Sequence, residues 1–209
     1  MPRLLSVNVG QPRQVSVRRG RPLMSAIGKS PVEGRVRVAG DNVEGDRQAD
    51  LRVHGGPDKA VYAYAAEDTA WWAGELGRPL GPGMFGENLT VEGIDVSGAV
   101  IGQRWQIAGV ELEVAQPRLP CSKLGLRFGD PKMVKRFGEA HRPGAYLRIV
   151  REGDIGAGDV IAVGSRPGHG VTVRMVADAI MLDETLLAEA SAAPGLPRDP
   201  ADWMRERAT

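Results

Sequence analysis

The sequence predicts a mostly β fold with some α (α+β), in which short strands form a barrel and a small helical tail follows. Gly and Pro account for 28 and 15 of the 209 residues. This is well above average usage but below the range of disordered chains, so it indicates many tight turns. Apolar segments before residue 165 are short and rich in β-branched residues, as in strands. Beyond 165 the strand signal ends and helical patterns begin.

Strands are predicted where β-branched or aromatic residues lie between Gly, Pro or Asp. These runs are 4–9, 32–38, 59–64, 144–150 and 159–163. Residues 104–115 predict a hairpin, because Val110, Leu112 and Val114 alternate with two glutamates and leave one face to water. The glycine-rich stretch 153–158 lacks a following helix and the phosphate-binding patterns, so we interpret it as a turn.

Helices interrupt the strands without alternating regularly, which favours a barrel over a doubly wound parallel sheet. One helix is expected from about Ala65 to Gly77, and it carries Trp71 and Trp72. Another is expected to begin at Asp130 as the N-cap, with a proline at its first position.

A domain boundary is predicted at 165–170, Ser-Arg-Pro-Gly-His-Gly, because this segment is dense in residues that break regular structure. Residues 1–165 would form the ligand-binding unit. Residues 171–209 would form a subdomain of three short helices, at 171–180, 183–191 and 199–207. About 40 residues is the lower limit for independent folding, so this tail should pack on the main domain or on a partner.

The charge balance excludes a global electrostatic attraction to nucleic acid or to an anionic membrane. Lys and Arg total 27 against 26 Asp and Glu, a net charge of +1, so any anion site must be local. A single cysteine forbids an internal disulfide, and the first ten residues lack a signal peptide's apolar stretch. These features predict a cytoplasmic protein. The oligomeric state is left open.

The most informative segment is 116–124, Gln-Pro-Arg-Leu-Pro-Cys-Ser-Lys-Leu, directly after the predicted hairpin. Two prolines stiffen the approach to Cys121, while Arg118 and Lys123 flank it in sequence. Nearby cations favour the thiolate, which binds soft metals or acts as a nucleophile. The alternative is that Cys121 is a small buried hydrophobic residue. The other common metal sites are disfavoured, because the three histidines are far apart and one cysteine cannot build a zinc or iron–sulfur site.

Two further segments contain polar residues beside glycines. In 52–62, Arg52 and Lys59 could reach a phosphate across the Gly55-Gly56 pair, although a solvent-exposed turn explains the same residues. In 85–89, Glu87 and Asn88 match the amide edge of a pterin or purine, whereas the alternative is a polar turn before a strand.

Together, His-Gly-Gly-Pro-Asp-Lys-Ala at 54–60, Phe-Gly-Glu-Asn-Leu at 85–89 and the Cys121 segment resemble the MOSC domain family. The family is named after the C-terminal domain of molybdenum cofactor sulfurases. The likeness is closer to its stand-alone bacterial YiiM-like type, a barrel followed by three helices. It implies a β-barrel related to the pyruvate-kinase β-barrel domain, with the molybdenum cofactor (molybdopterin) in a cleft and molybdenum bound to a cysteine.

The resemblance also implies an activity, the reduction of N-hydroxylated bases or related N-oxygenated small molecules, with electrons from a separate reductase. Cys121 would then bind molybdenum, and Lys59, Arg118 and Lys123 the cofactor phosphate. The remaining candidates, His54, Asp58, Glu87 and Asn88, would form walls that contact pterin or substrate. A cofactor or sulfur carrier without turnover would use the same binding residues, so sequence leaves this alternative open.

Overall fold

The computed structural model describes residues 1–18, 20–50 and 55–208. Its strands are β1 (Arg3–Val9), β2 (Arg13–Arg18), β3 (Arg21–Ser25), β4 (Ser30–Pro31), β5 (Arg35–Ala39), β6 (Asn42–Val43), β7 (Val61–Ala65), β8 (Leu89–Glu92), β9 (Arg104–Ile107), β10 (Val110–Pro117), β11 (Ala145–Arg151), β12 (Gly153–Gly156) and β13 (Ile161–Val163). Its helices are η1 (Pro57–Lys59), α1 (Ala66–Leu76), α2 (Ser122–Phe128), α3 (Met133–Glu139), α4 (Val173–Met181), η2 (Glu184–Leu186), α5 (Leu187–Ser191) and α6 (Arg198–Arg207). The predicted α+β class is confirmed.

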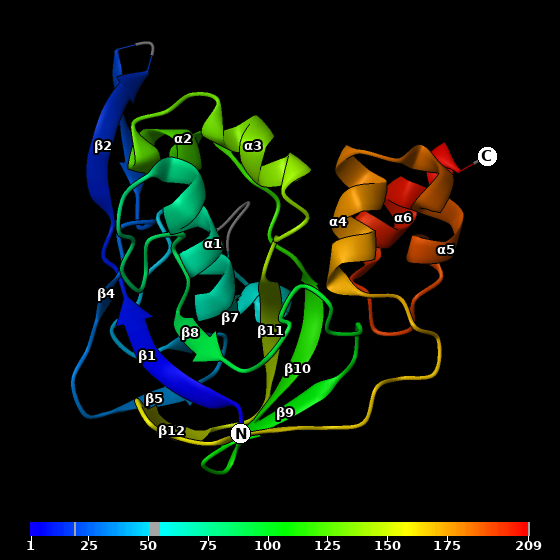
Figure 1. Cartoon of the computed structure of the whole chain (residues 1–209), viewed down its shortest axis with the longest axis horizontal. Helices are drawn as coiled ribbons and strands as arrows, with labels where there is room; N and C mark the ends of the chain where they lie inside the picture. Colours follow the sequence, from blue (N-terminus) through cyan, green and yellow to red (C-terminus); the bar gives the residue numbers. More distant parts are fainter. Residues whose placement is uncertain (19, 51–54, 209) are drawn as a thin grey trace.

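An eight-stranded sheet in the order β13-β9-β10-β11-β7-β8-β1-β4 forms the body of the described structure. Its ladders are antiparallel except between β7 and β8, which pair parallel. Parallel neighbours need a crossover connection, and α1 provides it along the sheet in Figure 1. α1 ends at Gly77, whose left-handed conformation (φ 61°) caps the last turn.

The sheet curls so that β1 approaches the start of β13, but the described residues form an open, barrel-like sheet and not the closed barrel that was predicted. Leu4 N–H donates to the Asp159 carbonyl at 2.9 Å, and Ile161 N–H donates to the Pro2 carbonyl at 2.9 Å. These bonds connect β1 to the segment leading into β13. Among the described residues, these few bonds are a short contact between β1 and the segment leading into β13. The continuous ladder of paired strands runs from β13 to β4.

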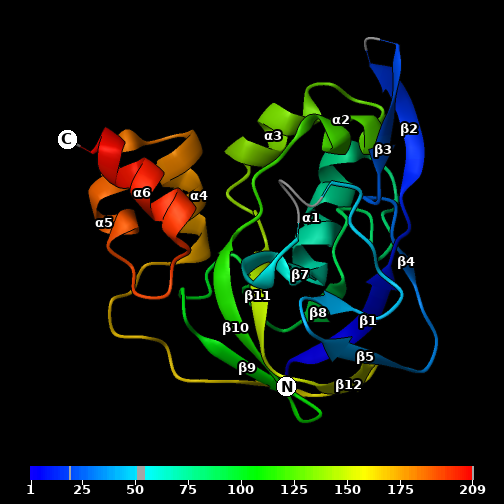
Figure 2. The ribbon, with the colours of Figure 1, turned by 180° about the vertical axis from the view of Figure 1, so that it is seen from behind.

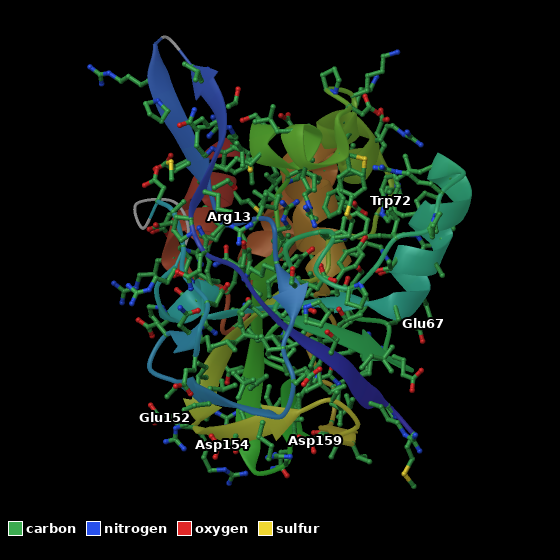
Figure 3. The ribbon with its side chains drawn as sticks, turned by 90° about the vertical axis from the view of Figure 1, so that its left-hand side faces the viewer. Arg13, Glu67, Trp72, Glu152, Asp154 and Asp159 are labelled. Atoms are coloured by element: carbon green, nitrogen blue, oxygen red, sulfur yellow. The ribbon has the colours of Figure 1, made fainter. Side chains whose placement is uncertain are left out.

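Two small sheets lie beside the main one. β12, β5 and β6 form the first, in that order, and β2 and β3 form the second, a two-stranded ribbon. The ribbon rises above the body of the molecule in Figures 1 and 3. Its side chains are mostly exposed, apart from Ser25 where β3 ends.

The C-terminal helices gather on one side of the sheet (Figure 2). Val173 N–H at the start of α4 donates to the Ala99 carbonyl at 2.9 Å. Val176 on α4 and Met204 on α6 belong to the same buried apolar cluster as Trp105 and Leu112 of the sheet. The tail therefore packs on the sheet through a shared core.

A second core lies beneath α1, α2 and α3 and is mostly aromatic. Tyr64 stacks on Phe85 with centroids 4.5 Å apart, and the indole N–H of Trp72 donates to the Tyr64 hydroxyl at 3.0 Å. Phe137 from α3 completes the stack on Trp72. This cluster forms a rigid backing for the cavity described below.

Several local predictions were wrong. Residues 153–156 form β12 and not a turn, because their backbone pairs with β5. The predicted strand at 59–64 begins later, at Val61, after the single helical turn η1. The helix expected to start after Asp130 begins at Met133, although the Asp130 side chain does accept the Lys132 N–H at 2.8 Å. Within the described segments, no helix combines the length and apolar character needed to cross a membrane.

Candidate functional site

A cavity with about 640 Å³ of empty space, part of it open to solvent, lies between the segment after β3, the segment after β6 and the segment joining β10 to α2. Polar and apolar side chains both contribute to its wall. The lining residues are Ser25, Ala26, Ile27, Lys29, Asp46, Arg47, Gln48, Ala49, Gly55, Lys59, Tyr62, Phe85, Gly86, Asn88, Arg118, Cys121, Lys123 and Tyr146.

Cys121 is half-buried in this wall. β10 carries the chain to the cavity and ends at Pro117, which pairs with Ala145 of β11. After a short connection, Cys121 adopts an extended conformation (φ −131°, ψ 170°) and α2 follows immediately. The strand and the helix on either side fix the cysteine backbone, which holds the thiol at the cavity.

Arg118 provides a cation in the same wall. Its side chain is buried, and its guanidinium carbon lies 5.8 Å from the Tyr62 ring centroid and 5.3 Å from that of Phe137. The aromatic faces attract the cation but do not accept hydrogen bonds from its edge. Nη1 has no hydrogen-bond partner within the described residues. Since a buried unpaired donor costs about 1–3 kcal/mol, the site suits a ligand that supplies an acceptor.

Two tyrosines support this part of the wall. Tyr62 donates its hydroxyl to the Pro143 carbonyl at 2.8 Å, and its ring lies 5.2 Å from that of Tyr146. Burial raises the pKa of both hydroxyls above the usual value, although the Arg118 charge opposes that shift. Both are therefore neutral at physiological pH. Gly144 (φ 64°) permits the close packing, because a Cβ there would lie 2.9 Å from the Tyr62 ring and 2.6 Å from the Tyr64 ring.

A buried ion pair forms another part of the cavity, and sequence reasoning missed it. Lys29 Nζ binds Asp46 Oδ2, with side-chain exposures of only 10% and 1%. Asp46 also accepts the Asn88 amide at 2.9 Å and the Gly10 N–H at 2.7 Å. Burial lowers the pKa of Lys29, while Asp46 and Glu87 act in the opposite direction. The Asp46 carboxylate thus holds the Lys29 amino group in place at the cavity wall, where it can donate a hydrogen bond.

The predicted site residues are distributed unevenly around this cavity. Lys59, Asn88, Arg118, Cys121 and Lys123 line it together. The Asn88 amide is largely committed to the fold, because Oδ1 accepts the Tyr62 N–H at 3.1 Å and Nδ2 binds Asp46.

Two other predicted site residues lie outside this cavity, and two more fall outside the described residues. Glu87 is fully buried outside the cavity lining and accepts N–H groups of Gly83 at 2.6 Å and Phe85 at 3.0 Å, which is a structural role. Asp58 faces a neighbouring groove and pairs there with Arg148. Arg52 and His54 lie outside the described residues.

The cavity has no conventional set of protein metal ligands. Across the described residues, no three His, Cys, Asp or Glu side chains converge as a metal site would require. A metal at Cys121 would therefore need most of its ligands from elsewhere, as a dithiolene-bearing pterin supplies them.

Comparison with known proteins now identifies the family. The MOSC domain model matches residues 50–162. The chain is 39% identical over 171 residues to the uncharacterized protein YflK of Bacillus subtilis, covering 82% of this chain and 77% of YflK. It is also similar to a protein called "Reductase" from Gibberella moniliformis, 32% identical over 200 residues, covering 91% of this chain but only 35% of that longer protein.

The fold has a close solved counterpart in YiiM from Geobacillus stearothermophilus, with a TM-score of 0.80, 25% identity and complete coverage of both chains. The chain belongs to the MOSC domain family. The resemblance carried by the three sequence motifs is thereby confirmed, and all three motifs contribute residues to the cavity around Cys121.

Proposed function

We propose that this protein is an oxidoreductase that holds the molybdenum cofactor in the Cys121 cavity and reduces N-hydroxylated bases or related N-oxygenated small molecules. The observation that carries the proposal is the combination of a half-buried thiol and a buried guanidinium with an unpaired donor in one wall. Membership of a family associated with molybdenum cofactor sulfurases supports the cofactor, and the relative called "Reductase" supports the reaction class.

The residues present fit such a cofactor. Cys121 would ligate molybdenum, because soft thiolates suit this centre. Arg118, Lys59 and Lys123 would bind the pterin phosphate, for which charge-assisted hydrogen bonds are the strong choice. Tyr62 and Tyr146 give the cavity an aromatic wall against which a planar ring system can lie.

When bound, the cofactor supplies two-electron oxygen-atom chemistry. In the overall reaction, one N–OH group takes up two electrons and two protons, the N–O bond breaks, and an amine and one water molecule form. The chain itself binds and orients the reactants. The neutral hydroxyl of Tyr146 and the Lys29 side chain are two of the proton-bearing groups of the wall, and the aromatic residues close one side of the cavity.

We propose that the electrons come from outside these 209 residues, from a separate reductase. The chain carries no flavin or nicotinamide fingerprint and no cysteine set for an iron–sulfur cluster. The fungal "Reductase" is much longer than this chain. We therefore expect the purified, cofactor-loaded protein alone not to oxidise NADH or NADPH in the presence of substrate.

The test is to purify the protein from a molybdate-supplied host and measure molybdenum, pterin and the reduction of an N-hydroxylated purine with an artificial electron donor. Stoichiometric cofactor and turnover would support the proposal. Stoichiometric cofactor without turnover on any N-hydroxylated compound would favour the carrier alternative. Absence of molybdenum and pterin across hosts that make the cofactor would refute both.

A further inference from the structure

The β2–β3 ribbon concentrates positive charge on an otherwise balanced chain. Residues 13–25 contain four arginines and no acidic residue, whereas the whole chain carries only +1. Arg13, Arg18 and Arg21 are exposed, and within the described structure they make no ion pair or side-chain hydrogen bond. Several surface arginines elsewhere are paired, as Arg35 is with Asp159.

The ribbon also has little stability of its own. An isolated two-stranded ribbon is marginal in water, and this one pairs with no other strand in the described sheets. Arg18 and Arg21 lie directly opposite each other in the ladder, where like charges destabilise the pair. Val17 (60% exposed) and Met24 (39% exposed) add uncovered apolar surface. Local stability does not explain this sequence, so a binding role is indicated.

The position of the ribbon connects it to the cavity. Arg13 pairs with Ser25 at its base, and Ser25 lines the cavity with Cys121. Figure 3 labels Arg13 at this base, with the ribbon extending outward from it. A five-residue strand rises about 16 Å, so the arginines at the far end stand well beyond the cavity rim.

The basic surface continues around the mouth of the cavity. Arg47 and Lys123 belong to the lining. The guanidinium of Arg127 lies beside Gly28, between two lining residues. A partner seated against the ribbon would therefore meet cations from the ribbon tip to the cavity mouth.

We propose that the β2–β3 ribbon and the basic rim form the docking surface for a small acidic electron-transfer protein, which presents its redox centre to the Cys121 cavity. This inference rests on the proposed function. An acidic [2Fe–2S] ferredoxin has the required chemistry: two reduced ferredoxins each lose one electron, and the two electrons with two protons from solvent convert one N–OH group to N–H and water. Charge complementarity steers association, and the apolar Val17 and Met24 provide contact area within a charged rim.

Two other occupants are less compatible with these residues. Nucleic acid would engage the arginines through phosphates but would leave the exposed valine and methionine unmatched. A second copy paired about a two-fold axis at the ribbon would bring the Arg18–Arg21 pairs of both chains together, which is electrostatically unfavourable.

The decisive experiment measures binding of an acidic [2Fe–2S] ferredoxin to the full-length, cofactor-free protein by calorimetry at low and high ionic strength. The double variant Arg18→Glu/Arg21→Glu should bind about tenfold or more weakly at low salt, with a smaller difference at high salt. Arg205→Glu/Arg207→Glu is the matched control, since these two exposed arginines lie on α6 and line neither the cavity nor the groove beside it. Its affinity should equal that of the wild type. Val17→Ser/Met24→Ser should weaken binding at both ionic strengths.

Equal binding by the double variant and the wild type, or no binding by the wild type, would overturn the docking surface. So would tighter ribbon-dependent binding of an RNA or DNA oligonucleotide, or a change in sedimentation that assigns the ribbon to self-association. These binding measurements need no cofactor, so failure of the docking surface can be told apart from failure of the proposed function. Conversely, the double variant loaded with cofactor should keep wild-type turnover with an artificial donor and lose it only with ferredoxin.

Discussion

Arg118→Met should separate cofactor binding from stability. Arg118 is buried, yet Nη1 has no hydrogen-bond partner within the described residues, and the two aromatic rings are its main neighbours. Methionine preserves the length of the side chain and removes the charge. The question is whether the fold or the ligand requires the guanidinium.

The opposing contributions to stability are similar in size. Losing two desolvated cation–π contacts costs up to about 2 kcal/mol each, whereas removing a buried unpaired donor recovers about 1–3 kcal/mol. The cofactor-free variant should therefore unfold in urea within about 3 kcal/mol of the wild type. A charge-assisted hydrogen bond contributes about 1.5–3 kcal/mol. Losing it should weaken molybdopterin binding about 10- to 150-fold.

The assay pairs urea unfolding of the cofactor-free protein with an anaerobic titration of free molybdopterin followed by tryptophan fluorescence. Arg136→Met is the control, because Arg136 also lies over an aromatic ring, that of Trp72, but is absent from the cavity lining. Arg118→Lys should restore part of the affinity. Destabilisation of cofactor-free Arg118→Met by more than about 3 kcal/mol, or unchanged affinity, would refute the reasoning.

Three further outcomes are expected. Cys121→Ser should remove one molybdenum–sulfur contact from the X-ray absorption spectrum and abolish most turnover while the fold persists; an unchanged sulfur shell with normal turnover would remove Cys121 from the centre. Burial raises the pKa of Glu87 above its usual 4.5, so the stabilisation it contributes is complete below that value and declines as pH rises through the raised pKa. The excess stability of wild type over Glu87→Gln should therefore shrink with rising pH in urea titrations, and growth of that excess would contradict the assignment. A chain ending at Ser165 should retain cofactor affinity but melt at lower temperature, since Val173 and Val176 share the sheet's core; a folded truncated protein without cofactor affinity would place ligand contacts in the tail.

Local patterns in the sequence predicted the elements whose residues carry their own signal. The alternation of Val110, Leu112 and Val114 matches a strand with one buried face, and β10 has that burial pattern. Gly77 ends α1 where expected, because its left-handed conformation suits glycine. In contrast, β12 contains two glycines in four residues and looks like a turn. Its pairing with β5 depends on backbone groups that sequence does not distinguish.

The candidate site was only partly predictable for a related reason. Cys121, Arg118 and Lys123 are neighbours in sequence, so one motif revealed them. Lys29 and Asp46 have no local motif, and the packing of three separate segments brings them to the cavity. Glu87 and Asn88 were recognisable as unusual polar residues, but their sequence could not reveal that the backbone occupies most of their hydrogen-bonding capacity. The β2–β3 segment does carry a strand signal, since Val15 and Val17 alternate with polar residues and Gly20 follows, yet no strand was predicted there.

The absence of a side chain at Gly144 has a consequence for the cavity's charge. A methyl group there would meet the rings of Tyr62 and Tyr64 and the Ala63 carbonyl at 2.6–2.9 Å. Gly144→Ala would therefore push Tyr62 from its place, and the Arg118 cation rests on that ring. The position of the buried Arg118 charge thus depends on residue 144, directly before β11, having no side chain beyond hydrogen. Substitutions at Gly144 should therefore alter ligand affinity although Gly144 is not among the residues that line the cavity.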